Sequence, residues 1–219
     1  MKIVKPSIKI LDVIDQISIL QRLELIGRTC YKSEDRISSS SCIEFVRKII
    51  KSGHHAIIEH YNISVRVICD RGVTHEIVRH RIASYAQEST RYCNYASGKF
   101  GNEITVVEPC FWQPETPGEI NDYYIADEKK RVWSATMLYT EAAYQRLIEL
   151  GASPQEARSV LPNSLKTEII ITMNLREWRH FLTLRTSKAA HPQMQEVSKM
   201  ILKEFKEKLP VIFEDIGHD

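Results

Sequence analysis

The chain of 219 residues is long enough to bury a substantial core in one domain, or in two small ones. Its formal net charge of +2 argues against a nucleic-acid coat or a membrane-surface protein. No apolar run approaches the about 20 residues of a membrane span, and the first residues lack a signal-peptide pattern. We therefore expect an intracellular, cytoplasmic globular protein.

Thiol and metal chemistry have little support in the sequence. Only Cys93, two residues after Arg91, has a basic neighbour that could favour a nucleophilic thiolate. His54, Glu59 and His60 are metal-ligand types, but their spacing fits no common zinc template, so loop polar groups are the preferred interpretation. We expect no metal site and no disulfide, because the five cysteines form no CxxC pair and fit no zinc spacing. The cysteines are Cys30, Cys42, Cys69, Cys93 and Cys110.

Hydrophobic periodicity predicts the elements of the first half of the chain. In chain order they are a strand at 8–11, a helix at 14–28, a helix opened by a capping box of Ser41 and Glu44 and ending at Gly53, a strand at 63–69, a helix at 73–82 and a long functional loop at 84–102.

The second half alternates between the same two kinds of element. In chain order they are a strand at 104–107, a loop at 114–117, a long helix through Trp133 and Ile148 to about Gly151, a short helix opened by Ser153, Pro154 and Glu156, a strand at 168–173, a helix at 175–186 and a last helix at 191–209. There is no internal repeat and no linker. We expect a single α+β domain over residues 1–219, with a modest sheet covered by long helices.

The most unusual segment runs from Arg79 to Tyr92 and holds three arginines, a histidine, two serines, a Gln-Glu pair and two tyrosines. A solvated basic surface is the ordinary interpretation of such a stretch. On the predicted helix, however, Arg79, His80 and Arg81 would fan over about 200° and could not all face water. Since arginine binds phosphate and carboxylate, the segment predicts several anionic partners or a site shared between subunits.

A third polar cluster lies on the helix predicted at 175–186. Arg176 and His180 are four residues apart and share a face. Arg185 follows Leu182 and Leu184, so we expect it in an apolar context where a guanidinium needs a partner. Neither GxGxxG nor GxxxxGK[ST] occurs, so a nucleotide is not held by either of these glycine-rich loops.

Residues 79–91 read RHRIASYAQESTR and match every fixed position of the RHRxxSxxxxSxR motif of the flavin-dependent thymidylate synthases. The sequence resembles this family in order from about residue 50 to residue 190. The further elements that carry the resemblance are Gly53-His54, Glu59-His60, Glu76, Ala157-Arg158, Asn174 with Arg176, and Leu184-Arg185.

The resemblance implies the α+β fold particular to this family and a homotetramer that binds FAD at subunit junctions. It implies conversion of dUMP to dTMP, with 5,10-methylenetetrahydrofolate as carbon donor and NADPH as reductant through the flavin. No enzyme cysteine attacks the uracil ring in that chemistry. The implied partners are dUMP and folate, with no nucleic acid and no membrane.

The resemblance also assigns residues. Arg185 resembles the arginine that activates dUMP and is the catalytic candidate. Two departures stand out: His180 replaces a common Asn, and His191 lies two residues later than the family's His-x-Gln element. The implied dUMP-binding residues are Glu76, Arg79, Gln87, Glu88, Ser89, Thr90, Arg91, Arg158 and Arg185. The implied FAD-binding residues are His54, Ala56, Arg79, His80, Arg81, Gln87, Asn174, Arg176 and His180.

Two alternatives remain at this stage. One is a nucleic-acid or nucleotide-binding module that uses the arginines for phosphate contacts, which the small net charge and the lack of a known binding fold disfavour. The other is a flavin-binding relative that has lost activity. Flavin absorption distinguishes a flavoenzyme from the binding module, and only a dTMP assay distinguishes it from the inactive flavin-binding relative.

Overall fold

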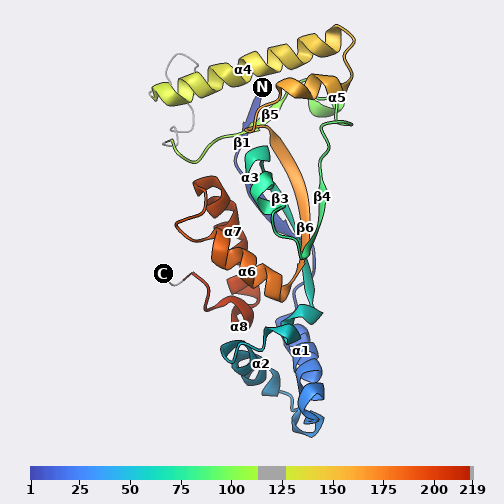
Figure 1. The fold of residues 1–219 in the computed structure, drawn as a ribbon, viewed down its shortest axis with the longest axis vertical. Coiled ribbons are helices and arrows are strands. Elements are labelled where there is room, and N and C mark those ends of the chain that lie inside the picture. Colours follow the sequence, from blue (N-terminus) through green and yellow to red (C-terminus); the bar gives the residue numbers. More distant parts are fainter. Residues whose placement is uncertain (113–126, 218–219) are drawn as a thin grey trace. The chain divides into compact units, whose positions relative to one another are not determined.

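The computed structural model describes residues 1–112 and 127–217 (Figure 1). The chain forms two compact units, each built from stretches that are distant in sequence. The first unit comprises Met1–Pro6, Ile68–Ile77 and Gln87–Ile169. The second unit comprises Ser7–Val67, Val78–Ala86 and Ile170–Asp219.

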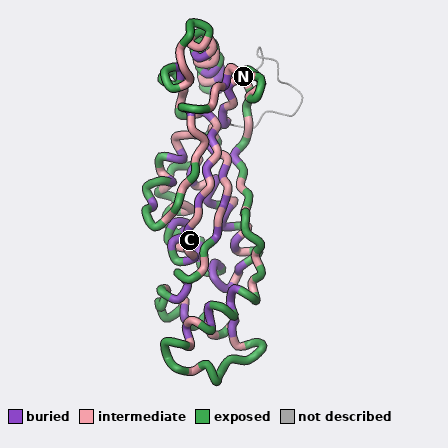
Figure 2. Tube along the Cα trace, turned by 90° about the vertical axis from the view of Figure 1, so that its right-hand side faces the viewer, coloured by how far each residue is buried: buried purple, intermediate pink, exposed green. Residues whose placement is uncertain are grey.

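Four strands form one sheet in the order β2-β3-β6-β4. Buried and half-buried positions alternate along β3 and β6, as the tube in Figure 2 shows. The side chains of Ile63, Val65 and Val67 are fully buried, which is why alternation in the sequence predicts this strand correctly. The strands are β2 (Ser7–Ile10), β3 (Asn62–Asp70), β4 (Ala83–Gln87) and β6 (Lys166–Asn174).

The second unit holds most of the helices. Trp178 and Phe205 pack edge to face at 5.2 Å in its core, and the Trp178 indole donates to the carbonyl of Ile63 at 2.9 Å. Helices α1 and α2 lie side by side (Figure 1), so closely that a Cβ on Gly27 would lie 2.6 Å from the Phe45 ring. The elements are α1 (Gln16–Tyr31), η1 (Glu34–Arg36), α2 (Ser41–Lys51), η2 (His55–His60), α6 (Leu175–Arg185), α7 (Pro192–Lys208) and α8 (Pro210–Phe213).

The first unit has its own core. Tyr144 is fully buried and contacts Tyr95, with ring centroids 5.8 Å apart. Strand β1 (Lys2–Val4) pairs in parallel with β5 (Thr105–Val107) in a separate two-stranded sheet. The helices of this unit are α3 (Arg71–Ile77), η3 (Gly98–Phe100), α4 (Glu128–Glu149), α5 (Pro154–Ala157) and η4 (Arg158–Val160).

The α+β class is confirmed, and the predicted strands and most predicted helices occur close to their expected bounds. The Ser153 cap, the Pro154 first residue and the Glu156 carboxylate open α5 as predicted. Strand β1 and helix α8 were not predicted from the sequence. The loop predicted at 114–117 lies outside the described residues.

The helix predicted at 73–82 is wrong beyond Ile77. Val78 and Ile82 are 41% and 67% exposed, so the apolar spacing that suggested a helix does not mark a buried helical face. The motif Arg79-His80-Arg81 therefore does not fan around a helix. The first residues of the loop predicted at 84–102 belong instead to strand β4. Half-buried and exposed residues alternate along β4, and the strand pairs with β6.

The capping box predicted at Ser41 and Glu44 is also wrong. Helix α2 is capped at Ser40, without a side-chain cap hydrogen bond. The Ser41 hydroxyl instead donates to Glu24 Oε2 at 2.9 Å and accepts from the Ser38 N–H. A sequence pattern for a cap was thus overridden by a buried carboxylate on α1. None of the helices in the described part of the chain is long and apolar enough to cross a membrane.

Candidate functional site

A chain of hydrogen bonds joins three charged or titratable side chains in the second unit. His80 Nδ1 lies 3.2 Å from Glu177 Oε1, and both residues are buried. The Arg185 Nε–H donates to His80 Nε2 at 3.1 Å. Arg185 is the last residue of α6, and Glu177 lies in the first turn of the same helix. His80 therefore lies between Glu177 and Arg185, although it precedes both by about a hundred residues in the sequence.

This geometry sets the tautomer of His80. Because Nε2 accepts from Arg185, the ring proton lies on Nδ1 and is donated to Glu177. Burial lowers the pKa of His80 below its usual value, the Arg185 guanidinium acts in the same direction, and Glu177 opposes them. We therefore describe His80 as a neutral imidazole near pH 7. The backbone carbonyl of His80 accepts a hydrogen bond from the Tyr85 hydroxyl at 2.7 Å, which also restrains the backbone at His80.

His80, Glu177 and His180 also have the spacing of a metal site, with ligand atoms within 4.8 Å of one another. Both ring nitrogens of His80 are already used, however, one as donor to Glu177 and one as acceptor from Arg185. A guanidinium beside the cluster also disfavours a second positive charge. We interpret the cluster as a hydrogen-bonded network rather than a metal centre.

An open pocket of about 560 Å³ in the second unit brings together three of the residues expected to bind FAD. Asn174 caps α6 by accepting from the Glu177 N–H at 2.8 Å, so its side chain is fixed at the helix start. Arg176 Nη1 donates to Glu59 Oε1 at 2.6 Å, so the Glu59 carboxylate is held in an ion pair. His180 is exposed on the same helix and lines the same pocket.

The other expected FAD residues of this unit have different surroundings. Arg79 and Arg81 are exposed, and neither makes an ion pair with a carboxylate among the described residues. His54 lies in a second pocket, where its Nδ1 is 3.1 Å from the Tyr31 hydroxyl. Ala56 is exposed in η2.

In the first unit, Gln87 and Glu88 are both held by neighbours. The Gln87 amide donates to the Thr74 and Thr167 hydroxyls at 3.1 and 3.2 Å. Glu88 accepts from the Tyr95 hydroxyl and from the ammonium of Lys166, each at 2.8 Å. Both carboxylate oxygens of Glu88 are therefore engaged.

The residues that follow Glu88 combine hydroxyl groups with the side chains of two arginines. The buried Thr90 hydroxyl is 3.5 Å from Arg158 Nη1, and the backbone N–H of Arg91 donates to the Ser89 hydroxyl at 3.4 Å. The guanidinium groups of Arg91 and Arg158 are on exposed residues. Two guanidiniums, two hydroxyls and turn N–H groups in one unit make a suitable phosphate-binding segment. Glu76 is half-buried on α3 in the same unit.

Comparison with known proteins shows to which family this chain belongs. The family model described as thymidylate synthase complementing protein matches residues 12–211. A flavin-dependent thymidylate synthase of Geobacter sulfurreducens is 33% identical over 201 residues, which cover 88% of this chain and 80% of the relative. The chain belongs to the flavin-dependent thymidylate synthase family.

Solved structures agree on the fold of this family member. A UMP/dUMP methylase from Streptomyces cacaoi, bound with 5-Br dUMP, superposes with a TM-score of 0.76 at 24% identity, over 98% of this chain and 96% of the other. A thymidylate synthase from Helicobacter pylori, with FAD and dUMP, gives a TM-score of 0.73 at 21% identity, over 96% and 98%. The resemblance read from residues 79–91 is therefore confirmed, together with the fold it implies.

For a thymidylate synthase of this family, the residues expected at FAD and dUMP separate by unit. The expected FAD residues lie in the second unit, apart from Gln87, and the expected dUMP residues lie in the first, apart from Arg79 and Arg185. Sequence reasoning missed Glu177, Lys166 and Tyr95, which hold expected site residues. Glu177 had one available signal, because a carboxylate next to the apolar Trp178 and near Phe181 needs a buried partner.

Proposed function

We propose that this protein makes dTMP by reductive methylation of dUMP, with 5,10-methylenetetrahydrofolate as carbon donor and NADPH as reductant, and without a cysteine nucleophile. Family membership makes it a flavin-dependent thymidylate synthase, an enzyme that methylates dUMP with FAD as cofactor. The observation that carries the proposal is a family match over residues 12–211 that contains the unbroken motif of residues 79–91.

The second unit has groups that suit FAD. Arg79 and Arg81 offer exposed guanidiniums without carboxylate partners in the described chain, a suitable donor set for a diphosphate. The pocket with Asn174, Arg176 and His180 offers amide, guanidinium and imidazole hydrogen-bonding groups, a suitable set for the polar edge of a flavin ring. When bound, FAD supplies the redox chemistry, and the protein supplies placement and electrostatics.

Arg185 is our candidate catalytic residue. The uracil ring must gain negative charge to act as a nucleophile, and a fixed guanidinium stabilises that charge. His80 accepts the Arg185 Nε–H, and this bond restrains the plane of the guanidinium. Glu177 in turn fixes His80, and we assign both residues as positioning groups for Arg185.

The first unit would hold the nucleotide through its phosphate and sugar. Ser89, Thr90, Arg91 and Arg158 supply hydroxyl, backbone N–H and guanidinium donors, as phosphate binding requires. Gln87 and Glu88 have less freedom, because Thr74, Thr167, Tyr95 and Lys166 hold them. We assign these two residues to orienting the nucleotide, together with Glu76 and Arg79.

The thiols support a mechanism without cysteine. Burial raises the pKa of Cys93 and of Cys69 above the ordinary thiol value, which disfavours the thiolate that attacks a uracil ring. Cys42 is also buried, whereas Cys30 and Cys110 are exposed. None of the expected dUMP or FAD residues is a cysteine.

We further propose a cytoplasmic homotetramer in which sites are shared between subunits. The exposed apolar side chains of Val78 and Ile82 flank the exposed Arg79 and Arg81, a combination that suits burial against another copy with a ligand between them. Both units contain discontinuous stretches and three strands belong to both, which supports treating residues 1–219 as one domain. Sedimentation of the FAD-loaded protein tests the tetramer, and a monomer that makes dTMP contradicts it.

The direct test of the function is an omission experiment. Purified protein is incubated with dUMP, FAD, 5,10-methylenetetrahydrofolate and NADPH, and dTMP is quantified with each component left out in turn. We expect dTMP only in the complete mixture. A protein that binds FAD and makes no dTMP in the complete mixture contradicts the proposal.

A further inference from the structure

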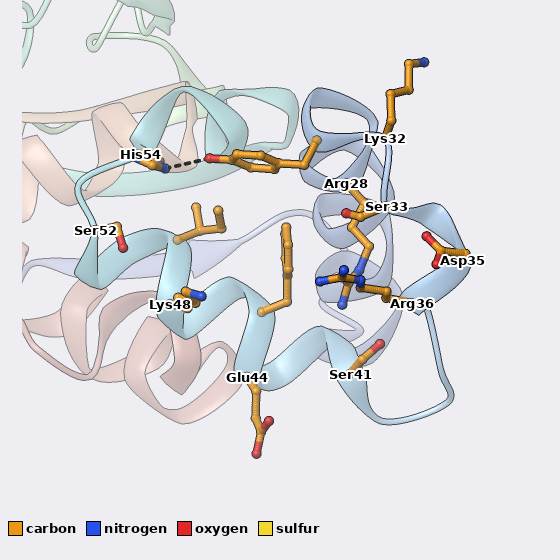
Figure 3. Close-up of a pocket in the computed structure, with 13 residues that line it drawn as sticks. Arg28, Lys32, Ser33, Asp35, Arg36, Ser41, Glu44, Lys48, Ser52 and His54 are labelled. Atoms are coloured by element: carbon orange, nitrogen blue, oxygen red, sulfur yellow. Dashed lines mark hydrogen bonds between the residues drawn. The ribbon is translucent and has the colours of Figure 1, made fainter.

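A second pocket of the second unit has a volume of about 730 Å³, and none of His80, Glu177 and Arg185 lines it. Residues of α1, η1 and α2 line it (Figure 3). Its charged lining residues, apart from His54, are four cations and two carboxylates. They are Arg28, Lys32, Arg36, Lys48, Asp35 and Glu44.

Arg28 is held rigidly at the wall of this pocket. Its Nε donates to Glu24 Oε1 at 2.8 Å, and its guanidinium carbon lies 4.7 Å from the centroid of the Phe45 ring. Glu24 is 1% exposed, and its second oxygen accepts from Ser41. Neither Nη of Arg28 hydrogen-bonds to a residue that the structure describes. A stacked guanidinium with two open N–H₂ groups is pre-organised for an oxyanion.

The charge inside the pocket is positive. Arg36 and Lys48 are exposed and form no ion pair within residues 1–112 and 127–217. In Figure 3 the side chains of Arg28 and Arg36 point toward one another, whereas the Glu44 carboxylate and the Lys32 ammonium point away from the pocket. Arg28 is paired with the Glu24 carboxylate, whereas Arg36 and Lys48 have no carboxylate partner among the described residues, so the charges of Arg36 and Lys48 attract an anion to this pocket.

The opposite side of the pocket leads to a residue expected at the flavin. His54 lines this pocket, and the Tyr31 hydroxyl holds its Nδ1 at 3.1 Å (Figure 3). A ligand whose anionic end lies between Arg28, Arg36 and Lys48 can therefore extend past Tyr31 and His54. Such a ligand combines an oxyanion with a ring system, as the reductant and the carbon donor of the proposed reaction both do.

We propose that this pocket binds the anionic end of a co-substrate, a phosphate or carboxylate group, with Arg28, Arg36 and Lys48 as its ligands. The inference rests on the proposed function, which supplies two sources of that chemistry. One source is the 2′-phosphate of the reduced nicotinamide, and the other is the glutamate carboxylates of the folate. The pocket thereby determines affinity and specificity for a co-substrate, and it takes no part in binding dUMP.

The test measures binding to the FAD-loaded protein by titration calorimetry, without turnover. The variants are Arg36→Gln and Lys48→Gln, which are exposed and keep most of the side-chain stem. Lys51→Gln is the matched control, because Lys51 is exposed on the same helix and is not among the residues that line the pocket. The probes are NADP⁺, NAD⁺, and tetrahydrofolate with one or several glutamates.

We expect each pocket variant to raise the Kd of one ligand class at least about fivefold, and less in about 1 M salt, which screens exposed charges. Weaker NADP⁺ with unchanged NAD⁺ assigns the pocket to the 2′-phosphate. Weaker tetrahydrofolate, more so with several glutamates, assigns it to the carboxylates. The inference is overturned if both variants bind every probe as tightly as the wild type and Lys51→Gln.

The same design separates this inference from the proposed function. A wild type that makes dTMP, with pocket variants of unchanged affinity, contradicts only the pocket. Weakened NADP⁺ or folate binding in the variants, with no dTMP from the wild type, supports the pocket and contradicts the function. Flavin absorption and dUMP affinity are measured in each variant, and we expect both to match the wild type.

Discussion

Arg185 Nε donates a hydrogen bond to His80 Nε2 at 3.1 Å, so the partner of this nitrogen of the candidate catalytic guanidinium is an imidazole. A carboxylate in that position would neutralise the charge of Arg185. A neutral imidazole at this nitrogen orients the guanidinium without cancelling its positive charge. The Glu177 carboxylate carries a negative charge and contacts the opposite nitrogen of the His80 ring, Nδ1.

The first prediction concerns Arg185 itself. Arg185→Ala removes the charge that stabilises the developing anion, and we expect the rate of dTMP formation to fall about 10²–10³-fold. Arg185→Lys should recover little, because an ammonium does not reproduce the planar fork. The measurement is single-turnover dTMP formation, with FAD content determined from flavin absorption. Normal dTMP formation with lower thermal stability alone would make Arg185 a structural residue.

Glu177 tests whether the positioning chain matters for the rate. Glu177→Ala leaves the Nδ1–H of His80 without its acceptor, and we expect a loss of about 1–3 kcal/mol in the free energy of unfolding. If Glu177 positions Arg185 through His80, kcat falls with little change in the KM of dUMP, and Glu177→Gln restores part of it because it still accepts. Glu204→Ala, an exposed carboxylate paired with Lys208, is the control. Unchanged kcat in a folded Glu177→Ala protein would argue against the positioning role.

The pH dependence of stability tests the charge state of His80. Burial first, and Arg185 next, lower its pKa in the folded protein, while Glu177 acts against them and His180 adds to them. In the unfolded chain His80 titrates near its usual value of about 6.5. The unfolded state therefore binds more protons below that pH, and stability is lost as the pH falls.

We expect the free energy of unfolding of the wild type to fall relative to His80→Gln between about pH 7 and pH 5.5, by at most about 1.4 kcal/mol per pH unit. Urea denaturation of both proteins across this range is the measurement. A wild type that gains stability over His80→Gln on acidification would show instead that Glu177 holds His80 as a cation.

The cysteines provide the fourth prediction. Replacing all five by Ser or Ala should leave the rate of dTMP synthesis within about tenfold, equivalent to about 1.4 kcal/mol. Cys42 and Cys69 are buried, so alanine is the substitution there and some loss of stability accompanies it. The decisive single variant is Cys93→Ala in folded, FAD-loaded protein. Loss of all activity in that variant would restore a nucleophilic cysteine to the mechanism.

Local pattern predicted those elements that have a periodic buried face or a complete N-terminal cap. The alternation of Ile63, Val65 and Val67 gives β3 directly, and the Ser153-Pro154-Gln155-Glu156 start gives α5. The helix around Arg79 failed because Val78 and Ile82 are apolar yet exposed, so their spacing reports no helical core.

The site was only partly predictable for a different reason. The family resemblance predicted His80 and Arg185 as site residues, but not the hydrogen bond between them. Glu177 and His80 are 97 positions apart, and Lys166 and Glu88 are 78 apart, so no short pattern shows either pair. Arg185 also differs from its predicted surroundings, because Leu184 is 48% exposed and the context is less apolar than the sequence indicates.

The most direct test of the central claim is tritium release from dUMP labelled at ring carbon 5, with purified protein, FAD, 5,10-methylenetetrahydrofolate and NADPH. Methylation must remove that hydrogen, so we predict tritium in water and an equal amount of dTMP. Both should disappear when FAD is removed and return when it is restored. FAD-loaded, folded protein that releases no tritium in the complete mixture would contradict the account.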